Sequence, residues 1–522
     1  MVDYIINNDT IIFDPEYNKP LDSELLLNYK KIIFSNYKLN NKLFEAYENN
    51  RFNYLSYISS KFNQTLSNSL DNLIVLTHLI FGCNFNQPLG NSLDTLMFLT
   101  HLTLGEYFNH PLGNSLDNLS SLTHLTLAIN FNHPLDNSLD NLISLMDLTF
   151  GSDFNQSLDN SLDNLKSLTH LTFGWNFNQP LDNSLNNLTF LTHLTFGSDF
   201  NQSLGNSLDN LISLTHLTFD WSFNQPLDNS LSNLTSLTHL TFSFDFCQPL
   251  GNFLSNLTLL THLTFGRDFD QPLRNSLDNL ISLTHLTFSY NFNQPLDNSL
   301  DNLISLTHLT FGDDFNQPLG NSLDNLTFLT HLTFGSDFNQ SLGNSLDNLT
   351  SLTHLPFDYY FTYPLDNSLD NLKSLTHLTF DGHFNQPLGI SLNNLPSLKY
   401  LSLGWDFKQK DDLPINIKTL SLDCNNSYYT DYLPDSIEEI ELGLNFNLEL
   451  INLPSSIKKI SFNKKSNYNK EFNCLPIKLE ILQLPNEYNI RIQNIPIGLK
   501  KLICSKNYKF IKDFSDIEVV SY

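Results

Sequence analysis

Cysteine is scarce in this sequence. Only 5 cysteines occur in 522 residues. They lie far apart, at positions 83, 247, 424, 474 and 504, and none belongs to a CxxC pair. The pattern therefore predicts free thiols in a reducing compartment. No apolar stretch of about 18 residues exists, which excludes a transmembrane helix. The N-terminus lacks the basic start and apolar core of a secretion signal, so we expect a cytoplasmic protein.

Basic residues are also few. The chain has 27 lysines and arginines against 54 aspartates and glutamates, which gives a formal net charge of −27. Proteins that bind nucleic acid or an anionic membrane need a basic surface, so this balance disfavours both partners. A basic protein partner or a bound cation fits the charge better.

The motifs that carry catalysis are missing too. The sequence contains no GxGxxG, Walker A, HExxH or GxSxG pattern. No nucleophile lies next to a base, and no cluster has the mixed ligands of a zinc site. We therefore expect no catalytic residue, no cofactor, no metal site and no enzyme activity.

The dominant feature is an internal repeat. Phenylalanine recurs at intervals of 23 residues, without insertion, from Phe62 to Phe407. One copy, Phe292 to Asp314, reads FNQPLDNSLDNLISLTHLTFGDD, and positions in the unit are numbered here from that phenylalanine. A single copy has too few apolar side chains to offset the entropy of ordering it. Copies must therefore bury their apolar sides against each other, as in a solenoid.

Two periods within the unit predict the path of each coil. Leu300, Leu303, Leu306 and Leu309 are three residues apart, which favours a short helical or 3₁₀ turn. Leu309 and Phe311 then alternate with polar residues, as in a strand buried on one face. The sequence predicts a right-handed, leucine-rich-repeat-like solenoid, with one parallel strand per coil and the turns on the opposite side.

The recurring FNQPL and SLTHLTFG segments resemble the FNIP-repeat family of social amoebae and giant viruses. The resemblance covers roughly residues 61–407, although Gln-Pro or Gln-Ser stands where the family name implies Ile-Pro. It implies an interaction module without catalytic residues, some members carrying an N-terminal F-box. If the chain is viral, the expected location is the host cytoplasm.

The chain outside the regular repeats falls into three further segments. After Phe407 an LPxxIKxLxL pattern, beginning at Leu413-Pro414, predicts degenerate coils that continue the solenoid over 408–509. Residues 510–522 are predicted to be a C-terminal cap or tail. Residues 1–60 do not repeat, although 21–50 have helical spacing. We interpret 1–60 as an N-terminal cap, a degenerate adaptor-binding segment of the F-box kind, or a disordered or family-specific segment.

A column of histidines occupies unit position 17 in thirteen copies, interrupted by Asp147 and followed by Tyr400. With position 18 buried, these side chains should stand on the exposed sheet face, ~4.8 Å apart. One interpretation is a neutral, stacked and hydrogen-bonded ladder, and the other is a pH- or metal-sensitive face. The candidate residues are His193, His216, His239, His262, His285, His308 and His331.

A row of aspartates occupies unit position 10 in eleven copies, including Asp301 and Asp324. Because the row lies near the start of the turn segment, it is predicted to complement free N–H groups there. Incidental cation binding and acid–base hydrolysis are the alternatives. Asparagines at positions 2, 7 and 11 predict side-chain amide ladders and turn bonds.

Unit position 22 varies most, and all 3 tryptophans of the chain occupy it. The position follows the strand, so it should form a rim of the sheet where large aromatic residues act as binding anchors. Local packing over the turn is the alternative. The candidate partner-binding residues are Trp175, Trp221, Phe244, Tyr290, Tyr359 and Trp405.

Three functional hypotheses follow. The first is a scaffold that binds a protein through its extended surface. The second is the substrate-recognition subunit of an F-box-type ubiquitin ligase, with residues 1–60 holding a Skp1-type adaptor. The third, a solenoid hydrolase using the aspartate row, has the least support.

Overall fold

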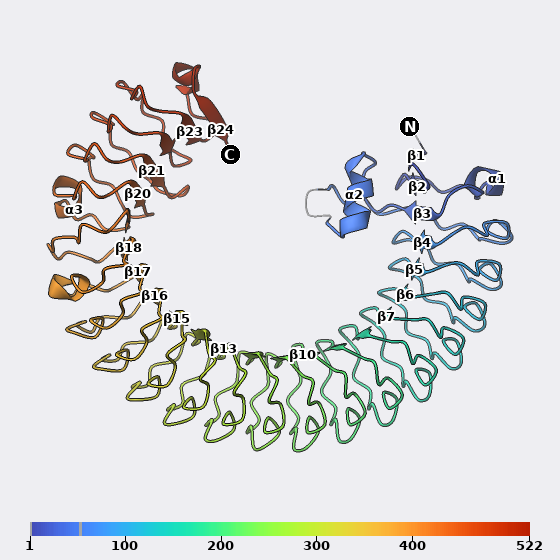
Figure 1. Ribbon diagram of the computed structural model, residues 1–522. Helices are drawn as coiled ribbons and strands as arrows, with labels where there is room; N and C mark the ends of the chain where they lie inside the picture. The colour runs from blue at the N-terminus through green and yellow to red at the C-terminus, as the bar shows by residue number, and fades with distance from the viewer. Residues whose placement is uncertain (1–2, 52–54) are drawn as a thin grey trace. The chain divides into compact units, whose positions relative to one another are not determined.

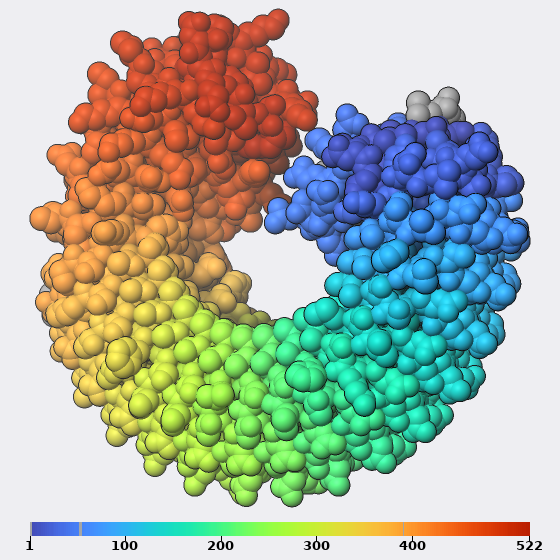
Figure 2. Space-filling view, turned by 45° about the vertical axis from the view of Figure 1, so that its right-hand side comes forward, coloured from blue at the N-terminus to red at the C-terminus, as the bar shows by residue number. Residues whose placement is uncertain are grey.

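The computed structural model describes residues 3–51 and 55–522. The chain forms two compact units, Met1–Arg267 and Asp268–Tyr522. In each unit, successive coils place their strands side by side on one face and their turns on the other (Figure 1). The surface of each unit follows the chain coil by coil, as the colour gradient of the space-filling view shows (Figure 2).

The first unit begins with a short non-repeating segment that already contributes strands. Its elements are β1 (Tyr4–Asn7), β2 (Thr10–Phe13), α1 (Ser23–Leu26), β3 (Lys31–Phe34) and α2 (Lys42–Asn49). The repeating coils of this unit then supply β4 (His78–Ile80), β5 (His101–Thr103), β6 (His124–Thr126), β7 (Asp147–Thr149), β8 (His170–Thr172), β9 (His193–Phe196), β10 (His216–Phe219), β11 (His239–Thr241) and β12 (His262–Thr264).

The second unit continues the same pattern. Its regular coils supply β13 (His285–Thr287), β14 (His308–Thr310), β15 (His331–Thr333), β16 (His354–Phe357), β17 (His377–Phe380), η1 (Gly389–Leu392) and β18 (Tyr400–Leu403). The coils after Phe407 supply β19 (Thr419–Leu422), α3 (Tyr428–Asp431), β20 (Glu439–Leu442), β21 (Lys459–Phe462), β22 (Ile481–Gln483), β23 (Lys501–Cys504), η2 (Ile511–Phe514) and β24 (Glu518–Ser521).

The repeat length sets the register of the sheet. Within each unit the regular strands pair in parallel with their successors, and equivalent positions face each other, as in His193↔His216 and His216↔His239. The chain therefore forms a leucine-rich-repeat-like solenoid, as predicted. The strands are only three or four residues long. Their stability must come from packing between coils.

The turn side is built from separate hydrogen-bonded turns rather than a continuous helix. Backbone bonds join residues three apart, such as Leu211 N to Leu208 O at 3.0 Å and Leu214 N to Leu211 O at 3.0 Å. Among the described residues of 61–407, a 3₁₀ helix forms only at η1. The predicted helical segment is thus reduced to successive 3₁₀-like turns, because each leucine must return to the core every third residue.

The core is a leucine column beside two phenylalanine columns. Leu300, Leu303 and Leu306 are fully buried. In the second compact unit, Phe292 stacks on Phe315 with 6.0 Å between ring centroids, and Phe311 stacks on Phe315 with 4.1 Å between ring centroids. Each ring therefore packs both against a ring four residues away in the chain and against the equivalent ring one repeat away. A copy removed from its neighbours would lose most of its apolar contacts.

Two backbone positions explain the small residues of the unit. Position 6 has positive φ, as in Gly205 (φ 48) and Asp228 (φ 41), which favours glycine and the short polar residues that tolerate this region. At position 21 adjacent coils almost touch. A Cβ added to Gly197 would lie 1.8 Å from the carbonyl oxygen of Gly174.

An amide ladder runs along the coils at position 2, as predicted. The Asn201 Oδ1 atom accepts the backbone N–H of Asn224 at 3.0 Å and the Nε2–H of Gln225 at 3.0 Å in the next coil. Asp270 takes the same role, accepting from Asn293 N and Gln294 Nε2 at 3.0 and 2.9 Å. Asparagine and aspartate can both serve at this position, because each supplies an acceptor oxygen.

Residues 21–50, which have helical spacing, contain the helices α1 and α2 but do not form one continuous helix. Strand β3 also lies within that range, because the β-branched Ile32 and Ile33 and the aromatic Phe34 favour an extended strand that continues the sheet. Strand β1 pairs antiparallel with β2, β2 pairs in parallel with β3, and β3 with β4. Residues 510–522 likewise include a strand, β24, which pairs with β23.

Helix α2 packs on the strand face instead of the turn side. Its buried Leu43 forms a cluster with Ile12 of β2 and Ile33 of β3, and Phe44 and Tyr47 pack against this cluster. The helix ends at Asn49, and the following residue, Asn50, caps it with a left-handed backbone (φ 52). As a result, α2 covers the open face of the first strands and leaves the later ones uncovered within its unit (Figure 1).

Candidate functional site

The histidine column stands on the open strand face, as the alternation predicted. In the first unit His193 stacks on His216 at 4.2 Å between ring centroids, with an interplanar angle of 11°. In the second unit His308 stacks on His331 at 4.3 Å. The rings are closer than the ~4.8 Å strand spacing and lie nearly parallel. The other candidate histidines, His239, His262 and His285, occupy the same position on β11, β12 and β13.

A threonine at position 16 fixes the tautomer of each ring. The Thr215 hydroxyl donates to the carbonyl oxygen of Thr192 at 3.0 Å and lies 2.9 Å from Nδ1 of His216. A hydroxyl has one proton. Since that proton goes to the carbonyl, His216 Nδ1 must donate to the hydroxyl oxygen. The neutral ring then carries its lone pair on Nε2.

Burial holds these rings in the neutral form. Desolvation, followed by repulsion from His193 and His239, lowers the pKa of His216 to about 4. Desolvation and the neighbouring histidines also lower the pKa of His331, His354 and His377. At neutral pH His216, His331, His354 and His377 therefore carry little positive charge and act as hydrogen-bond acceptors.

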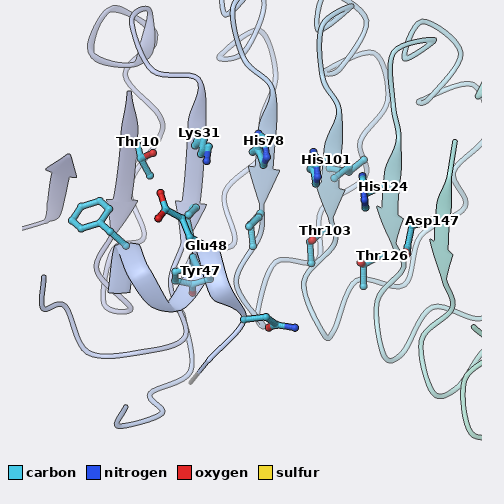
Figure 3. A pocket seen from close by; sticks show the side chains of 15 residues that line it. Thr10, Lys31, Tyr47, Glu48, His78, His101, Thr103, His124, Thr126 and Asp147 are labelled. Carbon is cyan, nitrogen blue, oxygen red and sulfur yellow. The ribbon is translucent and has the colours of Figure 1, made fainter. Parts of the chain in front are cut away.

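A pocket lies beneath α2 in the first unit, with a volume of about 560 Å³. Figure 3 shows Lys31, His78, His101 and His124 side by side on neighbouring strands, with Thr103 and Thr126 beside the histidines and Tyr47 and Glu48 coming from α2. The fifteen lining residues are Thr10, Lys31, Ile33, Phe44, Tyr47, Glu48, Asn50, His78, Ile80, His101, Leu102, Thr103, His124, Thr126 and Asp147.

The pocket contains two partly buried histidines of the column, His78 and His101. Desolvation lowers the pKa of His78 and of His101 to about 4, and the positive charge of Lys31 lowers both further. Thr77 and Thr100 lie 2.8 and 2.9 Å from their Nδ1 atoms. These rings therefore present neutral Nε2 acceptors on the strand side of the pocket.

The rim at position 22 is exposed and aromatic. In the first unit, Trp175 is 66% exposed and Trp221 is 53% exposed. Trp221 stacks on Phe244 at 4.5 Å, and the Arg267 guanidinium lies 5.2 Å from the centre of the Phe244 ring. The rim thus shows both the exposure predicted for a contact surface and local packing between coils.

In the second unit the same rim carries Tyr290, Tyr359 and Trp405, all exposed. His383 connects two of them, because its ring lies 4.8 Å from Tyr359 and 4.9 Å from Trp405. Its Nδ1 atom lies 3.2 Å from a carboxylate oxygen of Asp406. The aromatic candidates of this unit therefore include a continuous cluster.

The opposite edge of the sheet carries an apolar stripe that sequence reasoning missed. Its members occupy unit positions 13 and 14, just before each strand, and we call them the turn-side stripe. In the first unit they are Ile74, Val75, Met97, Phe98, Ile143, Phe190, Ile212 and Leu259, all exposed. The recurrence of large apolar residues at two positions outside the leucine period was the available signal. Exposed apolar residues in such a row are typical of contact surfaces.

Comparisons with known proteins place this geometry in a family. The FNIP Repeat model matches residues 408–445 and 425–465. The crystal structure of CroV588, described as a novel circular LRR protein structure, is 33% identical, with a TM-score of 0.67, over 97% of this chain and 77% of that chain. The chain belongs to the FNIP-repeat family. No curated protein matches it in sequence.

The FNIP-repeat fold extends to more distant structures. The TLR13–ssRNA13 complex matches with a TM-score of 0.60 at 18% identity, over 98% of this chain and 81% of that one. At this identity the likeness concerns the leucine-rich-repeat fold alone. The family model matches the C-terminal coils, and the regular coils carry the same strand register with their own FNQPL sequence.

The aspartate row of this FNIP-repeat chain does not act as predicted. Across residues 3–51 and 55–522 its carboxylates accept no hydrogen bond. Asp301 contributes its backbone carbonyl instead, which accepts Asn325 Nδ2–H at 3.0 Å. The capping prediction was wrong because the segment is a chain of separate turns whose N–H groups already bond to backbone carbonyls. Position 10 of one coil is thus held by the amide ladder at position 11 of the next.

Two further absences concern the described part of the chain only. It has no helix with the length and apolar character needed to cross a membrane. It also has no group of three or more histidine, cysteine, aspartate or glutamate side chains arranged to hold a metal ion.

Proposed function

We propose that this FNIP-repeat solenoid is a cytoplasmic, non-catalytic scaffold that binds a protein partner along its sheet. The observation that carries the proposal is the pair of exposed apolar edges that border the histidine–threonine face. Large aromatic side chains at a protein surface are typical anchors of protein contacts. The acidic net charge of −27 favours a partner with basic groups at its contact surface.

The aromatic rim is the proposed anchor of the interaction. Trp175, Trp221 and Phe244 lie on neighbouring or alternate coils of one unit, and exposed carboxylates such as Asp199 accompany them. The contact of Arg267 with Phe244 shows that a guanidinium fits over this rim. A basic side chain of the partner can therefore combine aromatic contact with attraction to a carboxylate.

The repeat offers variants that test this rim without disturbing the coil. Position 22 is serine in three regular copies, at Ser152, Ser198 and Ser336. The triple variant Trp175→Ser, Trp221→Ser, Phe244→Ser should therefore fold. Affinity purification from native host cells, with quantitative mass spectrometry, should show loss of a defined set of proteins recovered by the unchanged chain.

A matched control removes apolar surface from the other edge. Position 14 is serine in many copies, for example Ser213, so Phe98→Ser, Phe190→Ser and Leu259→Ser form an equivalent triple variant. If the rim variant recovers the same proteins as the unchanged chain, the aromatic rim is not the anchor. Loss with the control variant alone would assign the contact to the turn-side stripe.

For residues 1–60 we propose a cap rather than an adaptor-binding segment. The pairing of β2 with β3 and of β3 with β4 supports this, because the segment continues the sheet and covers the first regular coil. The ubiquitin-ligase hypothesis predicts a Skp1-type adaptor in the same purification. Its recovery by the full chain, lost on disrupting α2, would favour that hypothesis instead.

A further inference from the structure

The pocket beneath α2 is rich in hydrogen-bond acceptors. Its strand side presents Nε2 of His78, His101 and His124, because Thr77, Thr100 and Thr123 each lie within 2.9 Å of the Nδ1 atom of the ring that follows. Two carboxylates, Asp147 and Glu48, also line it, against one ammonium group, that of Lys31. The lining therefore carries a net negative charge and favours a ligand that donates hydrogen bonds.

The charges are arranged at opposite ends of the pocket. Lys31 is on β3 and Asp147 is on β7, four strands further, which corresponds to ~19 Å. Figure 3 shows Glu48 of α2 on the same side as Thr10 and Lys31, and Asp147 on the far side beyond His124. Glu48 therefore offsets the charge of Lys31, whereas Asp147 has no cation beside it among the lining residues.

Asp147 breaks the histidine column at the edge of this pocket. Strand β7 pairs with β6 and β8, so the Asp147 backbone lies between those of His124 and His170. Within the described residues its carboxylate accepts one hydrogen bond, from Thr149 Oγ1 at 3.4 Å. Most of its acceptor capacity therefore remains open, next to the imidazole rings on the two flanking strands.

We propose that this pocket binds the cationic end of an arginine or lysine side chain carried by a protein partner. The guanidinium or ammonium group lies between Asp147 and His124 and donates to the carboxylate and to the Nε2 atoms. The net charge of −27 attracts such a segment from a distance.

The repeat supplies a variant for the central residue. Thirteen copies carry histidine where this coil has Asp147, so Asp147→His completes the column and removes the charge without disturbing the fold. The control Asp163→Asn removes one negative charge from the same compact unit. Asp163 is at repeat position 10, where another copy has Asn186. Because Asp163 does not line the pocket, it reports general charge attraction.

The probes are three molecules, each tested by calorimetry and fluorescence anisotropy with the full chain. They are a capped Gly-Arg-Gly-Arg-Gly peptide, the same peptide with citrulline in place of arginine, and free spermidine. Citrulline keeps the shape of arginine without its charge. We expect the arginine peptide to bind at least about tenfold more tightly than the citrulline peptide, which corresponds to one well-placed charge pair.

The variants decide the assignment. Asp147→His should weaken the arginine peptide about tenfold, whereas Asp163→Asn should leave its affinity within about twofold of the unchanged chain. Equal weakening by both variants, or none with Asp147→His, overturns the proposal. Spermidine binding that depends on Asp147, without binding of the arginine peptide, overturns the protein source of the cation.

The inference rests on the proposed function only in assigning the cation to a protein partner. The two can fail separately, because the rim variants test recovery of the partner and Asp147→His tests the pocket with a defined peptide. Loss of peptide binding with an unchanged set of recovered proteins would leave the scaffold proposal intact.

Discussion

The hydroxyl of Thr215 lies 2.9 Å from Nδ1 of His216 and 3.0 Å from the carbonyl oxygen of Thr192 in the preceding coil. The same arrangement recurs in coil after coil, for example at Thr330 and His331. The threonine hydroxyl therefore connects two polar groups: a carbonyl of the preceding coil and the imidazole of the residue that follows the threonine. It sets both the ring tautomer and the direction of the free Nε2 atom.

Replacing Thr215 by valine should destabilise the solenoid by ~1–3 kcal/mol, because the His216 N–H loses an acceptor that valine cannot supply. The Thr192 carbonyl keeps the backbone N–H groups of Thr215 and His216 as donors. Chemical denaturation followed by circular dichroism gives the change. Thr218→Val is the control, since Thr218 lies on the same strand without such a bridge. An equal loss in both variants would contradict the role of the hydroxyl. In NMR spectra, His216 should also lose its preference for the Nδ1–H tautomer.

The pKa shifts of the histidines predict a stability that falls in acid. Burial lowers the folded-state pKa of His78, His101 and His216 from 6.5 to about 4. Between these values the unfolded chain binds protons that the folded chain does not, so their contribution is present above pH 6.5 and is lost as pH falls toward 4. Thermal melts between pH 7.5 and 4.5 should show the midpoint decreasing.

A histidine variant separates this effect from the titration of carboxylates. The double variant His78→Gln, His101→Gln should lose less of its melting temperature between pH 6.5 and 4.5 than the unchanged chain, by an amount equivalent to ~1 kcal/mol or more. The same pH dependence in both proteins would assign the acid sensitivity to other groups. Asp301→Asn, which changes a carboxylate outside the column, serves as the control.

The amide ladder can be tested by comparing two substitutions of Asn201, one by alanine and one by aspartate. Asn201→Ala should cost ~1–3 kcal/mol, since the Asn224 N–H and the Gln225 amide lose their acceptor. Asn201→Asp should cost much less, because Asp270 accepts the equivalent bonds in another coil. Urea denaturation of the two variants compares them directly. The ladder interpretation fails if aspartate is as destabilising as alanine.

The sequence was sufficient to predict the coil because its two periods are separate. Leucines every third residue and the alternation of Leu309 and Phe311 gave the buried side, the strand and the exposed histidine face. The equal spacing of Phe292 and Phe315 gave the register, since no insertion could shift one coil against the next. The periods did not determine whether the segment with leucines every third residue forms a helix or a series of separate turns.

The pocket could not be predicted, because it depends on where a single non-repeating helix packs. The residues of α2 show an apolar side, but only the tertiary structure places Leu43 against Ile12 and Ile33, and so puts the helix over the strand face. Asp147 was visible only as an interruption of the histidine column. Its position in a cavity required the structure, as did the exposure of the turn-side stripe.

The stacking of coils predicts how the chain tolerates deletions. Removing residues 200–222, one whole unit, joins Asp199 to Phe223 and reproduces the junction that Asp199 makes with Phe200. Strand β9 can then pair with β11 in the same register, and every buried position meets its equivalent. We expect a folded protein whose melting temperature lies within a few degrees of the original, because only one set of inter-coil contacts is lost.

Removing residues 200–210 instead should abolish soluble expression. This deletion leaves β10 in place but takes away Phe200, Leu204 and Leu208, which are buried, so the turn side of that coil cannot close. The deletion also shifts the register, so that apolar positions of this coil face polar positions of the neighbouring coils. Soluble yield and far-UV circular dichroism measure both variants. If the eleven-residue deletion melts as cooperatively as the whole-unit deletion, the coils do not depend on their neighbours for a shared core.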